Sequence, residues 1–203
     1  MLRLFGTART AQVLGIDISS TTVKLLELSR NGDAYRVESY SVAPLPPEAV
    51  VEKNVNQVDV VGGLISELVA RSKTRAQQAV AAVSGSAVII RTIAMPSCLS
   101  DEDLEAQLAL EADQYIPYPL DEVALDFEEL GPAMGRDDQV NVLLAACRQE
   151  TIESRIDSLE VAGLTPAIID VEVFAMERAL ALLRSQMPVA ATETIAMVDI
   201  GAS

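Results

Sequence analysis

The sequence predicts an α/β fold, in which apolar strands alternate with amphipathic helices. Half of the 203 residues are hydrophobic, only 3% are aromatic and Trp is absent, so the core must consist of Ala, Val, Leu and Ile. Such a composition is typical of strands that are buried on both faces of a parallel sheet. The length suffices for one large domain or two small ones.

Charge and cysteine content exclude several classes of protein. The formal net charge of −15 argues against direct binding to nucleic-acid backbones or anionic lipid headgroups. Cys98 and Cys147 lack C-x-x-C spacing and the chain has no His, so we expect neither a disulfide framework nor a zinc site. No apolar run approaches the roughly 18 residues of a membrane span. We therefore expect a cytoplasmic protein that is peripheral to a membrane only through a partner.

The first two predicted strands enclose a polar turn. Apolar residues fill 13–18 and resume over 23–28, which fits two strands and a tight turn better than a helix. Asp17 lies near the end of the first strand, and the turn offers consecutive N–H groups and hydroxyls, the components of a phosphate and Mg²⁺ site. An ordinary turn, whose side chains bond to nearby backbone, explains the same residues. The turn residues are Ser19, Ser20, Thr21 and Thr22.

The rest of the first domain, residues 1–86, continues with further strands and one helix. Asn31 and Gly32 predict a hairpin turn, because both tolerate positive φ, and a third strand follows at 35–42. Apolar residues recur at helical spacing from 58 to about 73. A short buried strand is expected at 79–83, and a Ser-Gly-Ser sequence at 84–86 marks the boundary of the domain.

Residues 87–170 are predicted to form an inserted α+β subdomain. The expected elements are a strand at 88–95, a helix at 101–114, paired strands at 126–130 and 140–146, a helix at 150–162 and a strand at 167–170. Ser100 is a suitable N-cap for the first helix, and Gly163 a suitable end for the second. Residues 171–203 then return to the first domain as a helix at 172–183 and a buried strand at 194–200.

Acidic residues are concentrated in the inserted subdomain. Between Thr92 and Gly135 there are eleven Asp and Glu residues and no Lys or Arg. A solvated face explains this run, and a surface for a basic partner segment is the alternative.

Five stretches resemble a known family. They are G-I-D-I-S-S-T-T-V-K-L-L-E-L at 15–28, R-T-I-A-M-P at 91–96, L-E-A-D-Q-Y-I-P-Y-P-L-D-E-V-A-L-D-F at 110–127, A-G-L-T-P-A-I-I-D-V-E-V-F-A at 162–175 and V-D-I-G-A-S at 198–203. Together they resemble the PilM family, the cytoplasmic actin-like assembly proteins of bacterial type IV pili. The segment E-A-D-Q-Y-I-P-Y-P is the most specific of them.

The resemblance implies an actin-like (ribonuclease H-like) ATPase fold. The PilM family is similar to the division protein FtsA, whose first lobe holds subdomain 1A and an inserted α+β (SHS2-like) subdomain 1C. The segment 87–170 matches the place of 1C, and 1–86 with 171–203 matches 1A. Since the chain ends just after the second phosphate motif, we expect it to be the first lobe only.

The same resemblance implies a nucleotide site. The first phosphate loop would comprise Asp17 and the turn residues 19–22, and the second Asp199 and Gly201. Asp17 and Asp199 would organise Mg²⁺ through water. Lys24 would either contact a phosphate or be a solvated surface residue. ATP and Mg²⁺ are expected for the intact protein and bind weakly, if at all, to one side of the cleft.

The implied function is that of a scaffold. The family binds the N-terminal cytoplasmic peptide of the inner-membrane protein PilN in a groove between subdomains 1A and 1C, and further pilus inner-membrane and motor components are expected as partners. We do not expect nucleic acid. Alternatively, the groove residues only pack the two subdomains together. The candidate groove residues are Ser84, Val88, Ile90, Ile169, Val171 and Phe174.

The rival interpretation is an enzyme, a sugar or polyol kinase of the same superfamily, since residues 15–24 also suit its first phosphate loop. Such kinases need a general-base carboxylate for the substrate hydroxyl. No Asp within 87–170 lies in a recognisable catalytic setting. We therefore expect a nucleotide-binding scaffold, with at most weak ATPase activity in the intact protein.

Overall fold

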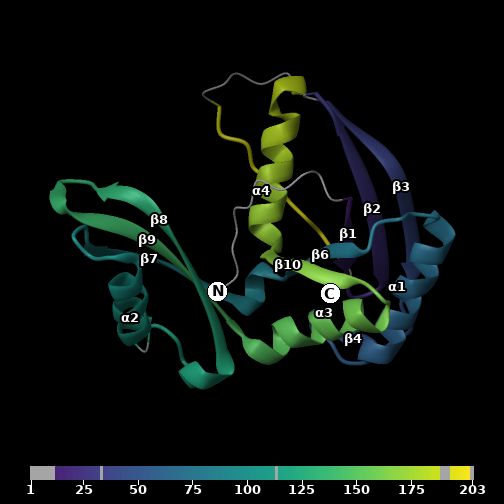
Figure 1. Ribbon diagram of the computed structural model, residues 1–203, viewed down its shortest axis with the longest axis horizontal. Helices are drawn as coiled ribbons and strands as arrows, with labels where there is room; N and C mark the ends of the chain where they lie inside the picture. Colours follow the sequence, from purple (N-terminus) through teal and green to yellow (C-terminus); the bar gives the residue numbers. More distant parts are fainter. Residues whose placement is uncertain (1–11, 33, 113, 188–192, 202–203) are drawn as a thin grey trace. The chain divides into compact units, whose positions relative to one another are not determined.

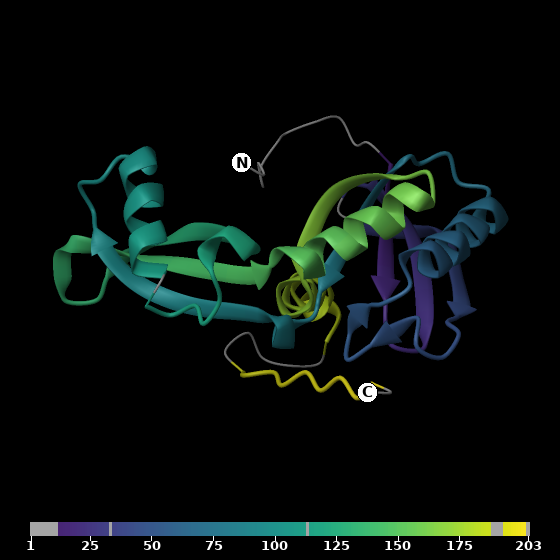
Figure 2. The same ribbon diagram turned by 90° about the horizontal axis from the view of Figure 1, so that it is seen from below.

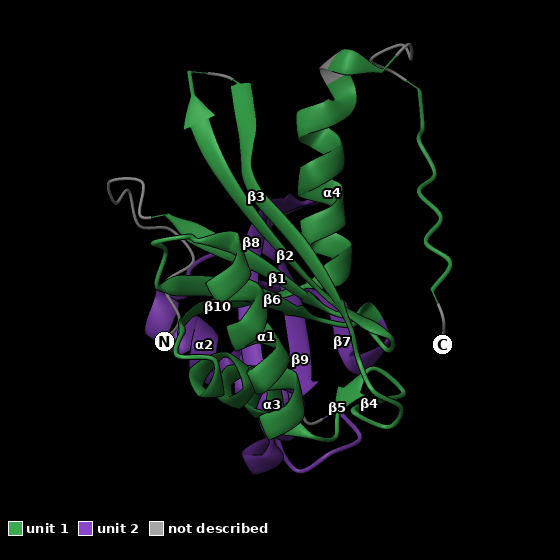
Figure 3. Ribbon diagram, turned by 90° about the vertical axis from the view of Figure 1, so that its right-hand side faces the viewer, with its two compact units in different colours: residues 1–85, 153–203 green, residues 86–152 purple. Residues whose placement is uncertain are grey.

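The computed structural model describes residues 12–32, 34–112, 114–187 and 193–201. The chain divides into two compact units, of which unit 1 comprises residues 1–85 and 153–203 and unit 2 comprises residues 86–152 (Figure 3). Unit 2 is therefore an insertion in the sequence of unit 1. Within the described ranges no helix is long and apolar enough to cross a lipid bilayer.

Unit 1 is built on a five-stranded mixed sheet in the order β10-β6-β1-β2-β3 (Figure 1). The β1–β2 and β2–β3 pairs are antiparallel, whereas β6 runs parallel to both β1 and β10. The inward residues of β1 and β2 alternate with outward ones, as the apolar pattern predicts. The strands are β1 (Val13–Ile18), β2 (Thr22–Asn31), β3 (Ala34–Pro44), β6 (Gln78–Val83) and β10 (Thr165–Val171).

Two helices contribute to the core of unit 1. Val61, Ile65 and Leu68 of α1 (Val58–Ser72) are fully buried in the same cluster as Leu159 of α3 (Gln149–Val161). The two helices come very close at Gly62, where an added Cβ would lie 2.5 Å from Val161 Cγ1 and 2.9 Å from the Ser158 carbonyl oxygen. A third helix, α4 (Glu172–Leu183), follows β10 directly and has no fully buried residue.

A buried arginine links three distant segments of unit 1. Arg155 is only 1% exposed; its Nε donates to the Ala82 carbonyl at 2.8 Å and its Nη2 to the Lys53 carbonyl at 2.8 Å. Lys53 lies in the turn between the two-residue strands β4 (Val50–Val51) and β5 (Asn54–Val55), which the sequence did not predict. Arg155 thus attaches this small hairpin to the end of β6.

Unit 2 is a three-stranded antiparallel sheet with one helix against it. The strand order is β7-β9-β8, from β7 (Val88–Pro96), β8 (Val123–Ala133) and β9 (Arg136–Arg148). The helix α2 (Asp101–Ala112) lies along one face (Figure 2), where Leu104 and Leu108 pack into the core of the unit. The Ser100 hydroxyl accepts a hydrogen bond from the Asp103 N–H at 3.2 Å, so Ser100 caps the helix as predicted.

Two predicted features differ from the structure. The segment 194–200 is not a strand, and its residues Val198 and Ile200 are 78% and 89% exposed. An apolar run becomes a strand only if another strand takes up its hydrogen bonds, and this segment has no such neighbour among the described strands. The second difference concerns the inserted subdomain, predicted as 87–170. Residues from 153 onward belong to unit 1, so most of α3 packs into the core of unit 1 and β10 pairs with β6 in its sheet.

Candidate functional site

The turn between β1 and β2 is closed by its own side chains. The Ser19 hydroxyl lies 3.0 Å from both the Thr22 carbonyl and the Thr22 hydroxyl, and the Thr22 N–H donates back to Ser19 Oγ at 3.3 Å. The Thr21 carbonyl accepts a hydrogen bond from the Leu45 N–H at 2.8 Å, which holds the turn against the segment after β3. Ser19 and Thr22 therefore shape the turn, as in an ordinary turn.

Ser20 and Thr21, at the tip of the turn, differ from Ser19 and Thr22 in their hydrogen bonding. Within the described part of the chain, neither their backbone N–H groups nor their hydroxyls have a hydrogen-bond partner. Consecutive free N–H groups in a tight turn form a concavity that suits an anion. The tip is thus the part of the turn whose chemistry fits a phosphate.

Asp17 and Lys24 form a cross-strand ion pair beside this turn. They are direct partners in the β1–β2 register, and Lys24 Nζ lies 2.7 Å from Asp17 Oδ2, with about half of each side chain exposed. The pKa of Lys24 is raised, first by the hydrogen bond to Asp17 and then by the Asp17 charge, with smaller contributions from Tyr40 and Asp199, while partial burial lowers it. An ion pair at this exposure adds little to stability.

The second predicted motif is the segment that ends at Asp199 and Gly201, and the segment 194–200 is not a strand. The Asp199 charge makes the smallest of the contributions that raise the pKa of Lys24. Gly201 is exposed. In the described residues no three His, Cys, Asp or Glu side chains are grouped to hold a metal ion. Two carboxylates suit Mg²⁺ that retains several waters.

The six predicted groove residues are divided between the units. In unit 1, Ser84 is buried, whereas Ile169, Val171 and Phe174 are half-buried on β10 and α4. Val171 pairs with Val83, the last residue of β6, so Ser84 follows directly beside the end of β10. The remaining two, Val88 and Ile90, are half-buried on β7 in unit 2.

Sequence reasoning missed two buried charged residues. Arg155 looks like one more polar residue on an amphipathic helix, and no local pattern distinguishes it. Glu27 is 5% exposed at an inward position of β2, directly after Val23 and Leu25 in the alternation. A carboxylate at an inward position was the signal that could have revealed it.

Comparison with known proteins identifies the family. The family model of the type IV pilus assembly protein PilM matches residues 15–203, which is nearly the whole chain. The chain belongs to this PilM family. A solved structure described as the PilM-PilN type IV pilus biogenesis complex is 33% identical with a TM-score of 0.74, over 86% of this chain and 51% of that chain. The chain thus spans about half the length of that relative.

Family membership confirms the predicted fold class, an α/β actin-like fold, in which unit 2 is an inserted α+β segment. More distant structures are the cytoplasmic domain of EpsL, an inner-membrane component of the type II secretion system of Vibrio cholerae, and an actin-like ATPase-fold protein of Bacteroides thetaiotaomicron. The EpsL domain is 12% identical (TM-score 0.49, 78% of this chain and 57% of that chain). The second is 7% identical (TM-score 0.41, 85% and 56%). Neither bears on function.

Proposed function

We propose that this chain is the part of an actin-like pilus assembly scaffold that binds the N-terminal cytoplasmic peptide of a PilN protein. The observation that carries the proposal is the 33% identity, over 86% of the chain, to a protein solved in a PilM-PilN complex. Through this peptide the protein would be held in the cytoplasm at the inner membrane. Further pilus inner-membrane and motor components would then assemble around it.

The strands that carry the candidate contacts suit peptide binding. β10 is an edge strand of the sheet in unit 1, and β7 is an edge strand of the sheet in unit 2. An edge strand presents unpaired N–H and C=O groups to which an extended peptide can bond, while side-chain pockets provide specificity. The half-buried Ile169 and Phe174 in unit 1, and Val88 and Ile90 in unit 2, are our candidates for such pockets.

Fluorescence anisotropy of a labelled PilN N-terminal peptide tests the proposal. The 203-residue chain should bind the peptide, and Ile90→Glu and Phe174→Ala should each weaken binding by about tenfold, equal to about 1.4 kcal/mol. Val37→Glu on β3, where Val37 is 58% exposed, is the matched control and should leave binding unchanged. Clear binding to the longer protein without binding to this chain would place the site in the other lobe and refute the assignment.

We further propose that the intact protein binds Mg-ATP at the β1–β2 turn. The free N–H groups of Ser20 and Thr21 would contact a phosphate, and Asp17 and Asp199 would hold Mg²⁺ through water. Asp17→Ala in the longer protein should weaken Mg-nucleotide binding in a calorimetric titration. The fold should persist, because Asp17 is half-exposed and its ion pair is a surface one. Unchanged affinity would refute the site.

A further inference from the structure

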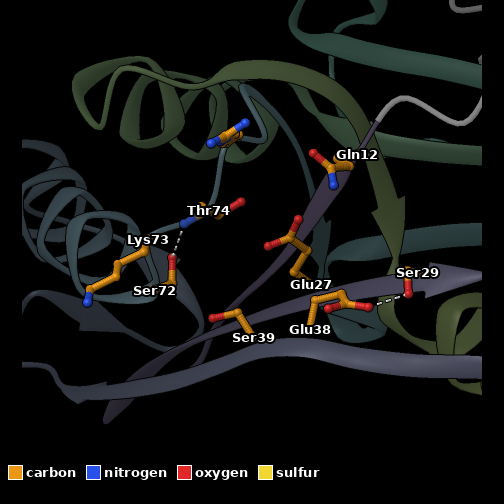
Figure 4. A pocket seen from close by; sticks show the side chains of 9 residues that line it. Gln12, Glu27, Ser29, Glu38, Ser39, Ser72, Lys73 and Thr74 are labelled. Carbon is orange, nitrogen blue, oxygen red and sulfur yellow. Dashed lines mark hydrogen bonds between the residues drawn. The ribbon is translucent and has the colours of Figure 1, made fainter.

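A polar cavity of about 450 Å³ lies in unit 1 beside the half of β2 that is remote from the β1–β2 turn. Its walls come from β2 and β3, from Gln12 before β1, and from the last residue of α1, Ser72, with residues 73–75 that follow it (Figure 4). Glu27 and Ser39, which face each other in the β2–β3 register, form one wall. The cavity belongs neither to the phosphate turn nor to the candidate peptide contacts.

Glu27 is the unusual member of this lining. It is only 5% exposed, and its carboxylate points from β2 into the cavity (Figure 4). Across the described ranges no side chain or backbone group donates to it, and neither Lys73 nor Arg75, the cations of the lining, forms an ion pair with it. The described residues contain no buried side-chain oxygen without a partner, so the oxygens of Glu27 reach the solvent of the cavity although the residue as a whole is buried. The carboxylate is therefore available to a cationic ligand.

The groups around Glu27 add hydrogen-bond acceptors to the negative charge of its carboxylate. Glu38 Oε1 accepts a hydrogen bond from the Ser29 hydroxyl and lies 3.6 Å from Arg36 Nε, so this carboxylate already has a cationic partner. The hydroxyl of Ser39 and the amide of Gln12 have no partner in the described part of the chain. The C-terminal end of α1, at Ser72, contributes the negative end of its helix dipole. The lining carries two carboxylates, Glu27 and Glu38, and two cations, Lys73 and Arg75. The group that suits the Glu27 side of the cavity is therefore a cation with several hydrogen-bond donors.

The size of the cavity and the arrangement of its acceptors indicate which kind of cation would bind there. A volume of about 450 Å³ falls in the range of small-molecule sites and exceeds that of a metal ion, and no metal-type cluster exists among the described residues. A guanidinium group carries five donors in a plane, pairs with a carboxylate through two parallel bonds and is weakly hydrated, whereas an ammonium group is a compact and strongly hydrated point charge. We propose that this cavity binds a guanidinium group, with Glu27 as the paired carboxylate.

Amide NMR titration of the full chain with N-acetyl-arginine amide tests the proposal. Saturable shifts should appear at Ser39, Thr74 and their neighbours, and Glu27→Gln, which removes the charge but keeps the shape, should weaken binding by about ten- to a hundredfold. The citrulline analogue has the same shape without the charge, and it should not bind. Equal binding of the citrulline analogue, or no loss of affinity in Glu27→Gln, would overturn the proposal.

A second ligand and a second variant complete the experiment. Agmatine is compared with N-acetyl-arginine amide, because tighter binding of agmatine indicates a free small molecule and tighter binding of the amide indicates an arginine side chain of a partner. If Glu27→Gln does not fold, Ser39→Ala and the citrulline comparison in the native chain decide the question. Failure of this experiment leaves the proposed PilN contacts unaffected, because none of them lines the cavity.

Discussion

Gly62 and Gly63 are adjacent in α1, but only Gly62 lies in the contact between α1 and α3. Substitution by Ala should therefore change the stability of the protein in opposite directions at the two positions. A Cβ at Gly62 would lie 2.5 Å from Val161 Cγ1 and 2.9 Å from the backbone carbonyl oxygen of Ser158, whereas a Cβ at Gly63 would meet nothing within 4 Å. Both residues lie inside α1, where Ala is favoured over Gly by about 0.5 to 1 kcal/mol. Gly63→Ala should therefore stabilise the protein by about that amount.

Gly62→Ala gains the same helix propensity but has to separate two packed helices. Overpacking of this kind costs about 1 to 3 kcal/mol, and the Ser158 carbonyl cannot rotate away because it belongs to the backbone of α3. Val161, which is β-branched, has few alternative rotamers in a helix. We expect a net loss of about 1 to 2 kcal/mol for Gly62→Ala, measured by urea unfolding as a lower midpoint at an unchanged slope. Equal stability of the two variants would show that α1 and α3 are not in this contact.

Four further predictions can be checked on the same protein. Arg155→Met should lower the free energy of unfolding by about 2 to 4 kcal/mol, since two buried carbonyls lose a charged donor, while the exposed Arg71→Met should change it by less than about 0.5 kcal/mol in the same assay. Asp17→Asn should lower the pKa of Lys24 in an NMR titration of lysine side-chain carbons, and Asp199→Asn should lower it less. Because that pKa is raised in the folded state, the pair stabilises the fold below the ordinary lysine value of 10.5 and loses its effect as the pH rises through the raised value. Calorimetry should find that this chain binds ATP more weakly than a two-lobed version; equal affinities would contradict the expectation that both sides of a cleft are needed. The association rate of the PilN peptide should fall as salt rises, because the chain carries a net charge of −15 that attracts any Lys or Arg on the peptide; stopped-flow rates independent of salt would exclude this steering.

The elements with a clear hydrophobic period could be predicted from the sequence. Alternation specifies β1 and β2, and the spacing of Val61, Ile65 and Leu68 specifies α1, because each pattern places apolar side chains on one face. The polar turn between β1 and β2 followed from the interruption of that pattern. The sequence predicted consecutive N–H groups in the turn, but it could not predict that those of Ser20 and Thr21 stay free, because this depends on the hydrogen bonds between Ser19 and Thr22.

The missed features depend on partners that a local pattern does not contain. Strands β4 and β5 have only two residues each, too few for any period. The apolar residues of β10 and of 194–200 look alike in sequence, yet only β10 has β6 beside it. Arg155 is buried against partners in remote segments, the carbonyls of Ala82 and Lys53, which no local pattern contains.

The parallel pair of β6 and β10 has a consequence for the order in which the protein can fold during synthesis. Their residues are separated by all of unit 2, so β10 leaves the ribosome roughly 4 to 17 s after β6 at ordinary translation rates. Unit 2 is continuous in sequence and can fold within that interval, which also shortens the effective loop that the β6–β10 pairing must close. Until Thr165–Val171 emerges, one edge of β6 has no strand partner in the nascent chain. A chaperone or a non-native strand would therefore bind this unpaired edge first, before synthesis of the chain is complete.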